Sequence, residues 1–499
     1  MPQSAGRARL AFALAAAFFV AWFFWFAGDS LQTDLTQDDL MNGWRGWFSS
    51  WQDQIRDTFF IWRVSPNYRP FGTLAYKVFF TFSGLDLRLM RVFLAGLILF
   101  NVYLVYALAR RLSGSREAGV LAALLHANHS GLSHLYYNTG TCFDILCFTF
   151  YFGALLCYVR IRQAGRYPRL LEGGSLCLLL ILGLSSKEMA VTLPALMALY
   201  EIIFHRPPLA RRELAGWLPR AAVIPAIGAA IVLLYVFGRV LAPEGISGQG
   251  GYRLTISFAQ YLETTSGYLG QLFNARQWFS PYQVFAFLLA VLALMWRSKA
   301  GVYGWLVFVA GILPMAFIPL RGVTAIYIPY AGLAICGAVG LIRLRDGLLR
   351  LRRRISGAVE PENGTVLGLY DRKAFVLFAV LAVVLFRVHA KYHTTLEPWL
   401  HEQNQIRSFL EQWRSLHPSI PKGGRVLVLK DPFGEFNWAS TFIGHLIYRE
   451  IVAIDRLPSM KQRPEAKSMS EYTYVLTYED AQLRDATPEE RVGAASTGR

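Results

Sequence analysis

Apolar stretches long enough to cross a lipid bilayer recur along most of this 499-residue chain. Most of them contain roughly 18 to 22 residues, the length that an α-helix needs to span the hydrocarbon core. About eleven spans are expected, at 8–28, 90–109, 117–135, 139–159, 173–185, 189–204, 217–241, 281–296, 300–319, 323–342 and 374–391. A stretch as short as 173–185 fits a tilted or re-entrant helix. The pattern predicts an all-α polytopic membrane protein.

The positions of the basic residues predict how the chain crosses the membrane. The net charge is +17, and the arginines and lysines gather in alternate loops, most densely between Arg343 and Arg354. Such an asymmetry marks the cytoplasmic loops of a membrane protein. We therefore expect a cytoplasmic N-terminus, an extracytoplasmic C-terminus and no nucleic-acid partner. Compact loops and the excess of arginine over lysine favour a bacterial plasma membrane, with the first apolar run kept as an anchor.

The chain divides into two parts of different composition. Residues 1–391 form the membrane module, which includes a long extracytoplasmic loop at 29–89. Residues 392–499 are more polar and open with an amphipathic stretch. Strand-like segments at 425–430, 451–454 and 472–478 alternate with a helical segment near 436–448, which indicates a small α/β domain. This domain carries no phosphate-binding or nucleophile motif, so we expect an accessory or docking role.

The loop at 29–89 contains two adjacent carboxylates, Asp38 and Asp39, about a dozen residues beyond the first span. Adjacent aspartates in a polar loop suit either a general base or the N-terminal cap of a helix. Downstream, bulky apolar residues recur at helical spacing between Trp44 and Trp62. This stripe predicts one helix that lies in the membrane interface, which we favour over a helix packed inside the loop.

Charged residues also occur at the other extracytoplasmic turns. Tyr68 and Arg69 precede the second span, Lys187 and Glu188 follow the fifth, and Arg321 precedes the tenth. The three cations suit a phosphate group, and Arg69 is also suited to tie loops together. Lys187 and Glu188 could simply neutralise one another. A glycine-rich loop at 242–280 suits either closure over a substrate or ordinary flexibility.

Three histidines, His126, His129 and His134, lie near the end of the expected span at 117–135. Their spacing admits a metal site, but such histidines are more often hydrogen-bonded spacers at a helix end, and we favour that interpretation. Asp144 lies just inside the next span, where a carboxylate is costly unless it is paired or faces water. It is therefore a candidate functional residue.

Together these residues resemble the GT-C class of polytopic glycosyltransferases, which use polyprenyl-phosphate sugars. The closest likeness is to the protein O-mannosyltransferase-like group whose eukaryotic members carry tetratricopeptide repeats, although this chain has no repeats. The likeness covers about the first 200 residues and rests on four motifs: Asp38-Asp39, Asn67-Tyr68-Arg69-Pro70, the stretch from His126 and His129 to Asp144, and Ser186-Lys187-Glu188 with Thr192. Ala127 stands where the group has a proline between the histidines.

The resemblance implies transfer of a sugar, with mannose as one candidate, from a polyprenyl-phosphate donor to a hydroxyl of an extracytoplasmic protein or glycolipid. Asp38 is then the expected base, and Asp39 the orienting carboxylate or the alternative base. The expected substrate-binding residues are Tyr68, Arg69, His129, Asp144, Lys187, Glu188 and Arg321. No metal ligands are assigned, and the need for a divalent cation stays open.

Two other functions fit a polytopic chain. A transporter or flippase of a lipid-linked glycan predicts inverted repeats and charges at mid-membrane, and neither is evident. An inactive GT-C-like scaffold would retain the fold and dispense with the aspartates.

Overall fold

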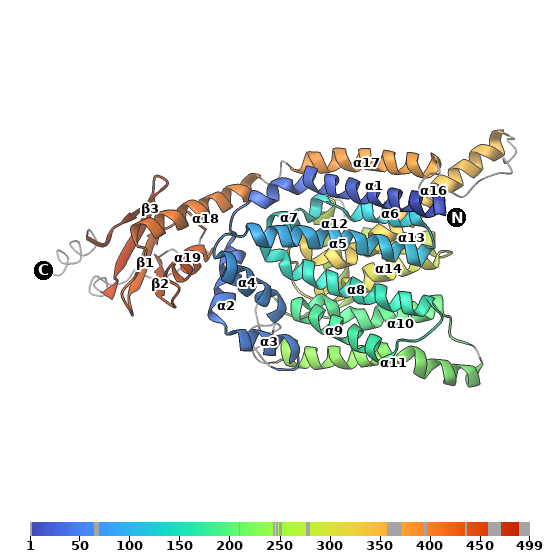
Figure 1. Cartoon of the computed structure of the whole chain (residues 1–499), viewed down its shortest axis with the longest axis horizontal. Helices are drawn as coiled ribbons and strands as arrows, with labels where there is room; N and C mark the ends of the chain where they lie inside the picture. The colour runs from blue at the N-terminus through green and yellow to red at the C-terminus, as the bar shows by residue number, and fades with distance from the viewer. Residues whose placement is uncertain are drawn as a thin grey trace.

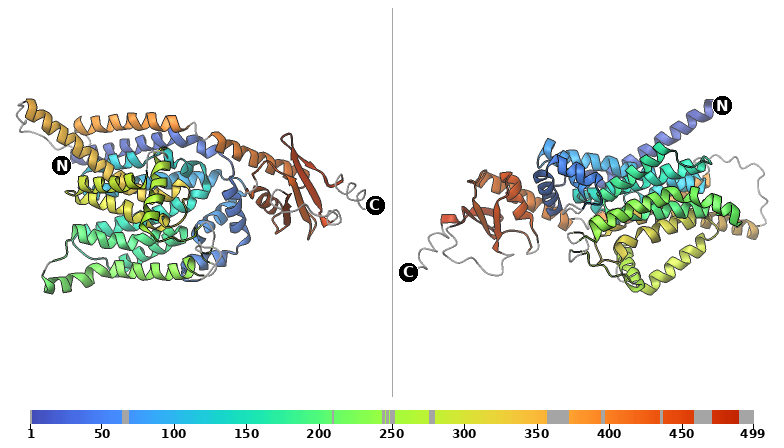
Figure 2. Two further views of the ribbon diagram at one scale, coloured as in Figure 1. Left: turned by 180° about the vertical axis from the view of Figure 1, so that it is seen from behind. Right: turned by 90° about the horizontal axis from the view of Figure 1, so that it is seen from below.

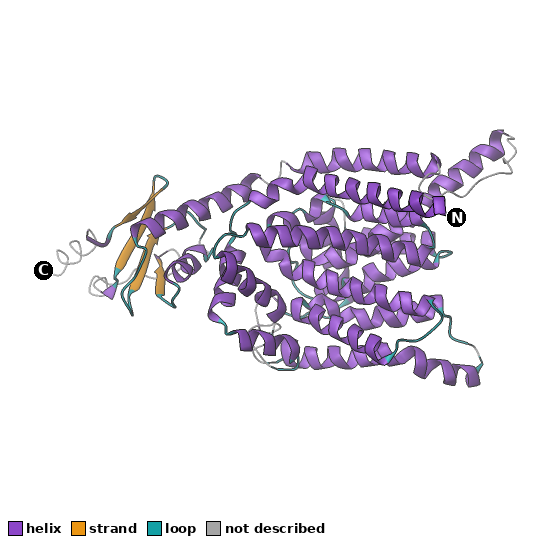
Figure 3. Cartoon of the chain, in the orientation of Figure 1, coloured by secondary structure: helices purple, strands orange, loops and turns teal. Residues whose placement is uncertain are grey.

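The computed structural model describes residues 2–63, 69–208, 210–242, 245, 248, 252–275, 280–356, 372–393, 397–434, 437–457 and 471–488 of the chain. Most of them are helical, and the strands lie near the C-terminus (Figure 3). The helices are α1 (Pro2–Ala27), α2 (Gln37–Phe48), α3 (Trp51–Phe59), α4 (Pro70–Ser83), α5 (Arg88–Ser113), α6 (Arg116–His126), α7 (His134–Tyr137), α8 (Cys142–Gln163), α9 (Leu170–Ser186), α10 (Leu193–Phe204), α11 (Arg211–Tyr235), α12 (Phe258–Leu272), α13 (Pro281–Met295), α14 (Lys299–Gly311), α15 (Leu313–Ala316), α16 (Tyr327–Ser356), α17 (Arg372–His393), α18 (Glu397–Leu416) and α19 (Ala439–Tyr448). The strands are β1 (Arg425–Lys430), β2 (Ala453–Arg456), β3 (Tyr474–Glu479) and β4 (Gln482–Asp485). Short 3-10 helices are η1 (Gly28–Gln32), η2 (Ser130–Leu132), η3 (Thr139–Thr141), η4 (Glu188–Thr192) and η8 (Val323–Ile326), and the π-helical η5 (Val236–Val240) continues α11.

The long helices run side by side as one bundle, and the sheet lies beyond one end of it (Figure 1). α1 and α17 lie along one edge of the bundle, and α11 lies along the opposite edge. α2, α3 and α4 lie at the end nearest the sheet, as two further views also show (Figure 2). We call this the site end of the bundle. The N-terminus lies at the other end.

Each of the eleven expected spans contains a helix. Among the described residues, seven helical stretches are long and apolar enough to cross a membrane: Leu10–Gln32, Arg88–Ser113, Thr139–Gln163, Arg212–Val240, Lys299–Ala316, Val323–Ser356 and Arg372–Tyr392. Leu170–Ser186 and Pro281–Met295 are shorter apolar helices. The other two expected spans contain α6 and α10, of 11 and 12 residues. The expected all-α polytopic membrane fold is confirmed.

The expected span at 117–135 is wrong in its second half, because α6 ends at His126. Asn128 has a φ of 52°, a left-handed conformation that interrupts a right-handed helix. The chain then continues through short helical turns to the start of α8 at Cys142. This irregular segment, residues 127–141, contributes several residues to the site described below.

α14 and α16 pack closely because two glycines face each other. A Cβ atom added to Gly332 would lie 2.4 Å from the Gly304 carbonyl oxygen, and one added to Gly304 would lie 3.0 Å from the Gly332 carbonyl oxygen. Small residues allow such close approach between helices in membranes, where no hydrophobic effect drives the helices together.

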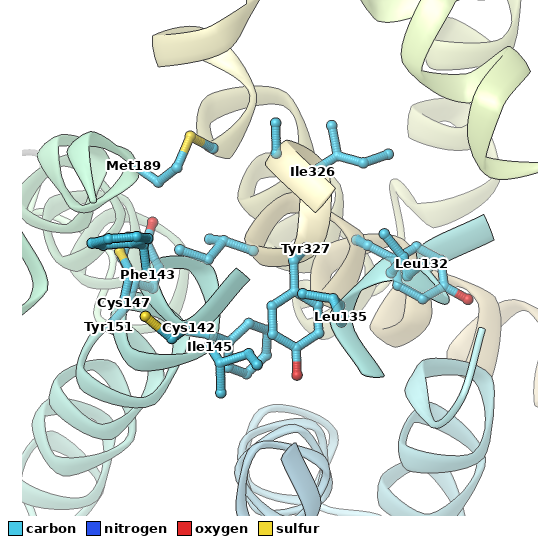
Figure 4. Packing of buried hydrophobic residues seen from close by; sticks show 14 of the residues in the cluster. Leu132, Leu135, Cys142, Phe143, Ile145, Cys147, Tyr151, Met189, Ile326 and Tyr327 are labelled. Carbon is cyan, nitrogen blue, oxygen red and sulfur yellow. The ribbon is translucent and has the colours of Figure 1, made fainter. Parts of the chain in front are cut away.

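An apolar core joins α8 to η4 and to the start of α16 near the site end. α8 contributes Ile145, Cys147 and Tyr151, which are all fully buried. Met189 of η4 and Tyr327 at the start of α16 belong to the same cluster (Figure 4). These two residues come shortly after the charged turns that contain Lys187, Glu188 and Arg321 in the chain, so the core fixes the backbone on which those side chains lie.

The tryptophan-rich stretch forms two helices rather than the expected single interfacial helix. Ser49 is extended, and the Ser50 side chain caps α3 by accepting a hydrogen bond of 3.0 Å from the Asp53 amide. The Trp44 ring lies 5.4 Å from the Phe442 ring of α19 and therefore packs against the C-terminal region. α3 keeps an exposed apolar face that includes Trp51.

The C-terminal region contains the expected α/β arrangement. The strand order is β2-β1-β3-β4; β1 is parallel to β2 and β3, and β4, which was not expected, is antiparallel to β3. Val426, Leu427 and Val428 of β1 are fully buried, as the central strand of a covered sheet requires. We call α18, α19 and the four strands the sheet region.

Candidate functional site

The two adjacent aspartates lie in the first turn of α2, where a capping box fixes them. The Thr36 side chain accepts a hydrogen bond of 3.2 Å from the Asp39 amide, and Asp39 Oδ2 accepts one of 2.9 Å from the Thr36 amide. This reciprocal pair satisfies two backbone donors that a helix start leaves open. Because successive helical residues point about 100° apart, Asp38 and Asp39 face different surroundings.

Asp39 faces the interior and is fully buried. Its Oδ2 also accepts a hydrogen bond from the Thr36 hydroxyl at 2.8 Å, and its Oδ1 accepts one from the Tyr76 hydroxyl at 2.7 Å and another from the Thr139 hydroxyl. Asp39 thus ties α2 to α4 and to η3. Its oxygens are occupied by these donors.

Asp38 is accessible to solvent, but it lines a polar cavity at the site end, where the surrounding protein still shields its carboxyl. Burial by the surrounding protein and the charge of Asp39 raise the pKa of its carboxyl above the ordinary value of 3.8, although a hydrogen bond from Asn138 and the charges of Arg69 and Arg321 act in the opposite direction. The Asn138 Oδ1 accepts a hydrogen bond of 2.7 Å from the Gly140 amide, which leaves its NH₂ group to face Asp38.

The cavity has a volume of about 520 Å³, within the range of small-molecule sites. Five of the nine expected site residues line it: Asp38, Arg69, Asp144, Lys187 and Arg321. They come from parts of the chain as far apart as the start of α2 and the turn before η8. The cavity therefore brings two carboxylates and three cations together.

Two ion pairs cross this cavity wall. Arg69 Nη2 and Nε donate to the two carboxylate oxygens of Glu188 at 2.8 and 3.1 Å, and Lys187 Nζ donates to Asp144 Oδ1 at 2.5 Å. Burial raises the pKa of the Glu188 carboxyl, but the nearby Arg69 and Lys187 charges outweigh it, so this pKa is lowered overall. Arg69 and Lys187 are thus each held in place by a carboxylate.

Arg321 reaches the cavity from the turn between α15 and η8. Its guanidinium carbon lies 4.5 Å from the centre of the Tyr252 ring, and its Nη2 donates to the Tyr252 hydroxyl at 3.3 Å. Its backbone N–H donates to the Tyr268 hydroxyl, also at 3.3 Å. Aromatic contacts of this kind orient a guanidinium and leave its charge intact.

The remaining expected residues lie elsewhere. His129 is buried outside the cavity lining; its Nδ1 accepts a hydrogen bond of 3.2 Å from the Gly131 amide, and its ring lies 4.7 Å from that of Tyr330. Glu188 is not part of the cavity lining and instead accepts hydrogen bonds from Arg69, which is. Tyr68 lies outside the described residues. Over the ranges that the structure describes, no group of three or more His, Cys, Asp or Glu side chains is placed to hold a metal ion.

Several residues that line the cavity were not among the expected catalytic or substrate-binding residues, although His134 was considered for a metal site. They are polar groups of the irregular segment and of the end of α12: Ser130, Ser133, His134, Asn138, Thr141, Gln271 and Asn274. Apart from the histidine spacing that includes His134, their sequence signal was position: one group belongs to the histidine-rich turn and the other lies near the end of the glycine-rich loop. The break in the helix at Asn128 brings the first group to the cavity.

Comparison with known proteins supports the fold. No known family model matches the chain, and neither does any curated protein. Among solved structures, ArnT from Cupriavidus metallidurans bound to undecaprenyl phosphate has a TM-score of 0.50 and 13% identity, over 96% of this chain and 94% of that one. The apo oligosaccharyltransferase of Archaeoglobus fulgidus has a TM-score of 0.48 and 14% identity, over 88% of this chain and 64% of that one.

The same oligosaccharyltransferase tethered to an acceptor peptide gives a TM-score of 0.45 and 13% identity, over 88% of this chain and 63% of that one. At such identities the likeness concerns the fold. The ArnT structure matches nearly the whole length of the chain, including the sheet region. The chain is therefore a polytopic membrane protein with a GT-C-like fold.

Proposed function

We propose that this protein transfers a sugar from a polyprenyl-phosphate donor to a hydroxyl group of an acceptor. The observation that carries the proposal is the composition of the cavity. The solvent-accessible carboxylate of Asp38 lines the same cavity as the cations Arg69, Lys187 and Arg321. A leaving phosphate needs cations, and an attacking hydroxyl needs a base. One cavity supplies both.

The proposed reaction is a single displacement. The acceptor oxygen attacks the anomeric carbon and its proton passes to the Asp38 carboxylate, while the bond between that carbon and the phosphate oxygen breaks. The electron pair leaves with polyprenyl phosphate, whose charge the three cations stabilise. Attack opposite to the leaving group inverts the anomeric centre. Asp39 has its oxygens occupied, so in this proposal it positions α2 and Asp38 alone is the base.

The resemblance to the mannosyltransferase-like group makes mannose the first donor to test, with an extracytoplasmic protein or glycolipid as acceptor. The proposed location is a bacterial plasma membrane, with the site end facing outward. Support comes from the arginine-rich end of α16, residues 350–354, which projects from the end of the bundle opposite the sheet region (Figure 1).

The test uses purified protein in nanodiscs with polyprenyl-phosphate mannose and other polyprenyl-phosphate sugars, and measures release of free polyprenyl phosphate. We expect turnover, or slow hydrolysis when no acceptor is present. Donor binding without any turnover would favour the scaffold function. Movement of the intact donor between the leaflets of a proteoliposome would favour the flippase.

Replacing Gly140 with alanine is expected to lower turnover by roughly tenfold to a hundredfold, as small misplacements of catalytic groups do. A Cβ atom at this position would lie 2.8 Å from the Asp38 Cβ and 2.7 Å from the Asn138 Oδ1, so one of them must move. The measurement is kcat together with the thermal unfolding temperature. The matched control is Gly153→Ala in α8, where an added Cβ has nothing within 4 Å. Equal kcat values for the two variants would contradict a tight fit around Asp38.

A further inference from the structure

Gln403 of α18 reaches from the sheet region into the site end of the bundle. Its side chain is buried, with 1% of the residue exposed. Its Oε1 accepts a hydrogen bond of 3.0 Å from the Asp34 amide, and its Nε2 donates one of 3.2 Å to the Tyr137 carbonyl oxygen. One planar amide group therefore joins two separate segments through their backbones, which only a side chain with both a donor and an acceptor can do.

Each of these segments leads directly to a group at the cavity. Asp34 precedes the cap of α2, which begins the turn that contains Asp38, and Tyr137 immediately precedes Asn138. The Asn138 amide in turn donates to the Asp38 carboxylate. The distance between the two segments thus affects the contact between Asp38 and Asn138.

A second buried side chain holds the same two segments from the bundle. Arg91 of α5 donates from Nη2 to the Asp34 carbonyl oxygen at 2.6 Å and from Nη1 to the Tyr137 carbonyl oxygen at 3.3 Å. The Asp34 residue is therefore bound at its N–H by Gln403 and at its carbonyl oxygen by Arg91. Arg91 belongs to the bundle, whereas Gln403 belongs to the sheet region.

Other contacts between the sheet region and this loop are weaker candidates for such a role. Arg407 also reaches Asp34, with Nη1 3.2 Å from Oδ2, but its side chain is largely exposed. Exposed ion pairs contribute little to positioning. The Trp44 ring packs on α19 at the far end of α2 from Asp38. Gln403 is the buried polar contact that acts next to the reacting group.

We propose that Gln403 is a positioning residue for sugar transfer, which holds the Asp38 carboxylate against the Asn138 amide by joining the Asp34 and Tyr137 segments. The inference rests on the proposed function. It gives the sheet region a direct part in forming the site, beyond the accessory role expected from its sequence.

The pH profile distinguishes positioning from simple stabilisation. The Asn138 hydrogen bond lowers the pKa of Asp38, so loosening it raises that pKa and moves the acidic limb of the rate profile to higher pH. The other charged or titratable groups near Asp38 are Asp39 on its own helix, Tyr76 of α4, and Arg69, His134, Asp144, Lys187, Tyr252 and Arg321 around the cavity. None of them is substituted in the variants below.

The experiment compares Gln403→Leu, Gln403→Glu and the matched control Gln405→Leu in full-length protein in nanodiscs. Gln405 lies on the same helix, and its Nε2 lies 3.1 Å from Nε2 of the exposed side chain of His401. The readouts are kcat and KM for polyprenyl-phosphate mannose, the pH profile of kcat, and hydrogen exchange of residues 29–40 and 133–141.

For Gln403→Leu we expect kcat to fall about tenfold with the donor KM changed less than about twofold, because the base is misplaced and the phosphate site is not. The acidic limb should move to higher pH, and both segments should exchange faster. Gln403→Glu keeps the acceptor for the Asp34 amide and, when ionised, loses the donor for Tyr137. It should therefore keep protection of 29–40 and lose protection of 133–141.

The inference is overturned if Gln403→Leu matches Gln405→Leu in kcat and in exchange, or if kcat falls with an unchanged acidic limb. If Gln403→Leu fails to fold, the nearly isosteric Gln403→Glu variant tests the inference instead. Equal protection of residues 29–40 and 133–141 in that variant would overturn it. Absence of turnover in the wild-type protein would instead reject the proposed function. Hydrogen exchange would still show whether Gln403 joins the two segments.

Discussion

Replacing Asp38 with asparagine is expected to abolish sugar transfer while the protein stays folded and still binds the donor. Asparagine has the same shape but cannot accept the acceptor's proton, and a positioned base is worth roughly 10²–10⁴ in rate. The cations that hold the phosphate are unchanged. The measurements are kcat in nanodiscs and donor binding by the same preparation.

The same substitution is expected to raise the unfolding temperature at neutral pH. The pKa of Asp38 is raised in the folded protein, so the folded state binds more protons than the unfolded state between the unfolded and the folded pKa. Stability therefore falls as pH rises through that interval, and the ionised carboxylate destabilises the fold above it. Asparagine removes this penalty, and thermal unfolding measured at pH 7 would detect the gain.

Two other aspartates in the same loop serve as controls. Asp53 also lies in the first turn of a helix and bonds its cap, Ser50, but it is exposed, so Asp53→Asn should leave transfer unchanged. Asp39→Asn would place an NH₂ group against the hydroxyl donors that now bond Asp39, and should lower stability. Retention of transfer within about tenfold in Asp38→Asn would contradict its role as the base.

Replacing Lys187 with methionine should reduce both transfer and stability. The phosphate site loses one cation, and removing one such group costs about 10²–10³ in rate. Asp144, which is 7% exposed, loses the ammonium that it now contacts at 2.5 Å. Removing one partner of a buried ion pair costs about 3–5 kcal/mol, because the other charge stays buried. Kinetics and thermal unfolding measure the two effects separately.

The double variant Lys187→Met/Asp144→Asn separates the two roles of Lys187. It removes the uncompensated carboxylate, so we expect stability to recover and transfer to stay low. Lys299→Met is the matched control, since Lys299 is exposed at the start of α14. Recovery of transfer together with stability in the double variant would mean that Lys187 serves only the fold.

The sequence predicted the fold well because a bilayer restricts the choices available to a chain. An apolar stretch that crosses lipid must be helical to satisfy its backbone, so length and composition suffice to locate it. The error at 117–135 arose because Asn128 ends α6 early, and nothing in an apolar count marks one residue with a left-handed conformation. The prediction of a single tryptophan-rich helix was wrong for a similar reason. Ser50 caps a new helix, α3, within a periodic apolar pattern that continues across the break.

The sequence pointed to five of the charged residues that line the cavity, but not to the partners that hold them. Motifs indicated Arg69, Lys187 and Glu188, with mutual neutralisation of the last two left open. The backbone at Lys187 is extended, with φ −159° and ψ 147°, and Glu188 begins the 3-10 helix η4, so the two adjacent side chains leave the backbone in different directions. Lys187 therefore meets Asp144, and Glu188 meets Arg69. Such partners depend on the packing of distant helices, which a pattern along the chain does not contain.

The division of roles between Asp38 and Asp39 depends on packing in the same way. Both lie in one helical turn, and the sequence alone could not say which carboxylate faces the cavity. Tyr76 and Thr139 decide it by bonding Asp39. Gln403 was missed altogether, because its partners are backbone atoms of residues distant in the chain.

The contact between Asp34 and Gln403 joins residues 369 positions apart. A ribosome that adds about 5–20 residues per second needs on the order of a minute or less to make that stretch. During this interval every membrane helix before α18 can be inserted while the loop with Asp38 still lacks one of its two supports. The second support of this loop is therefore added only after the membrane helices that precede α18, so a chain truncated before α18 would keep the bundle but lack the Gln403 contact.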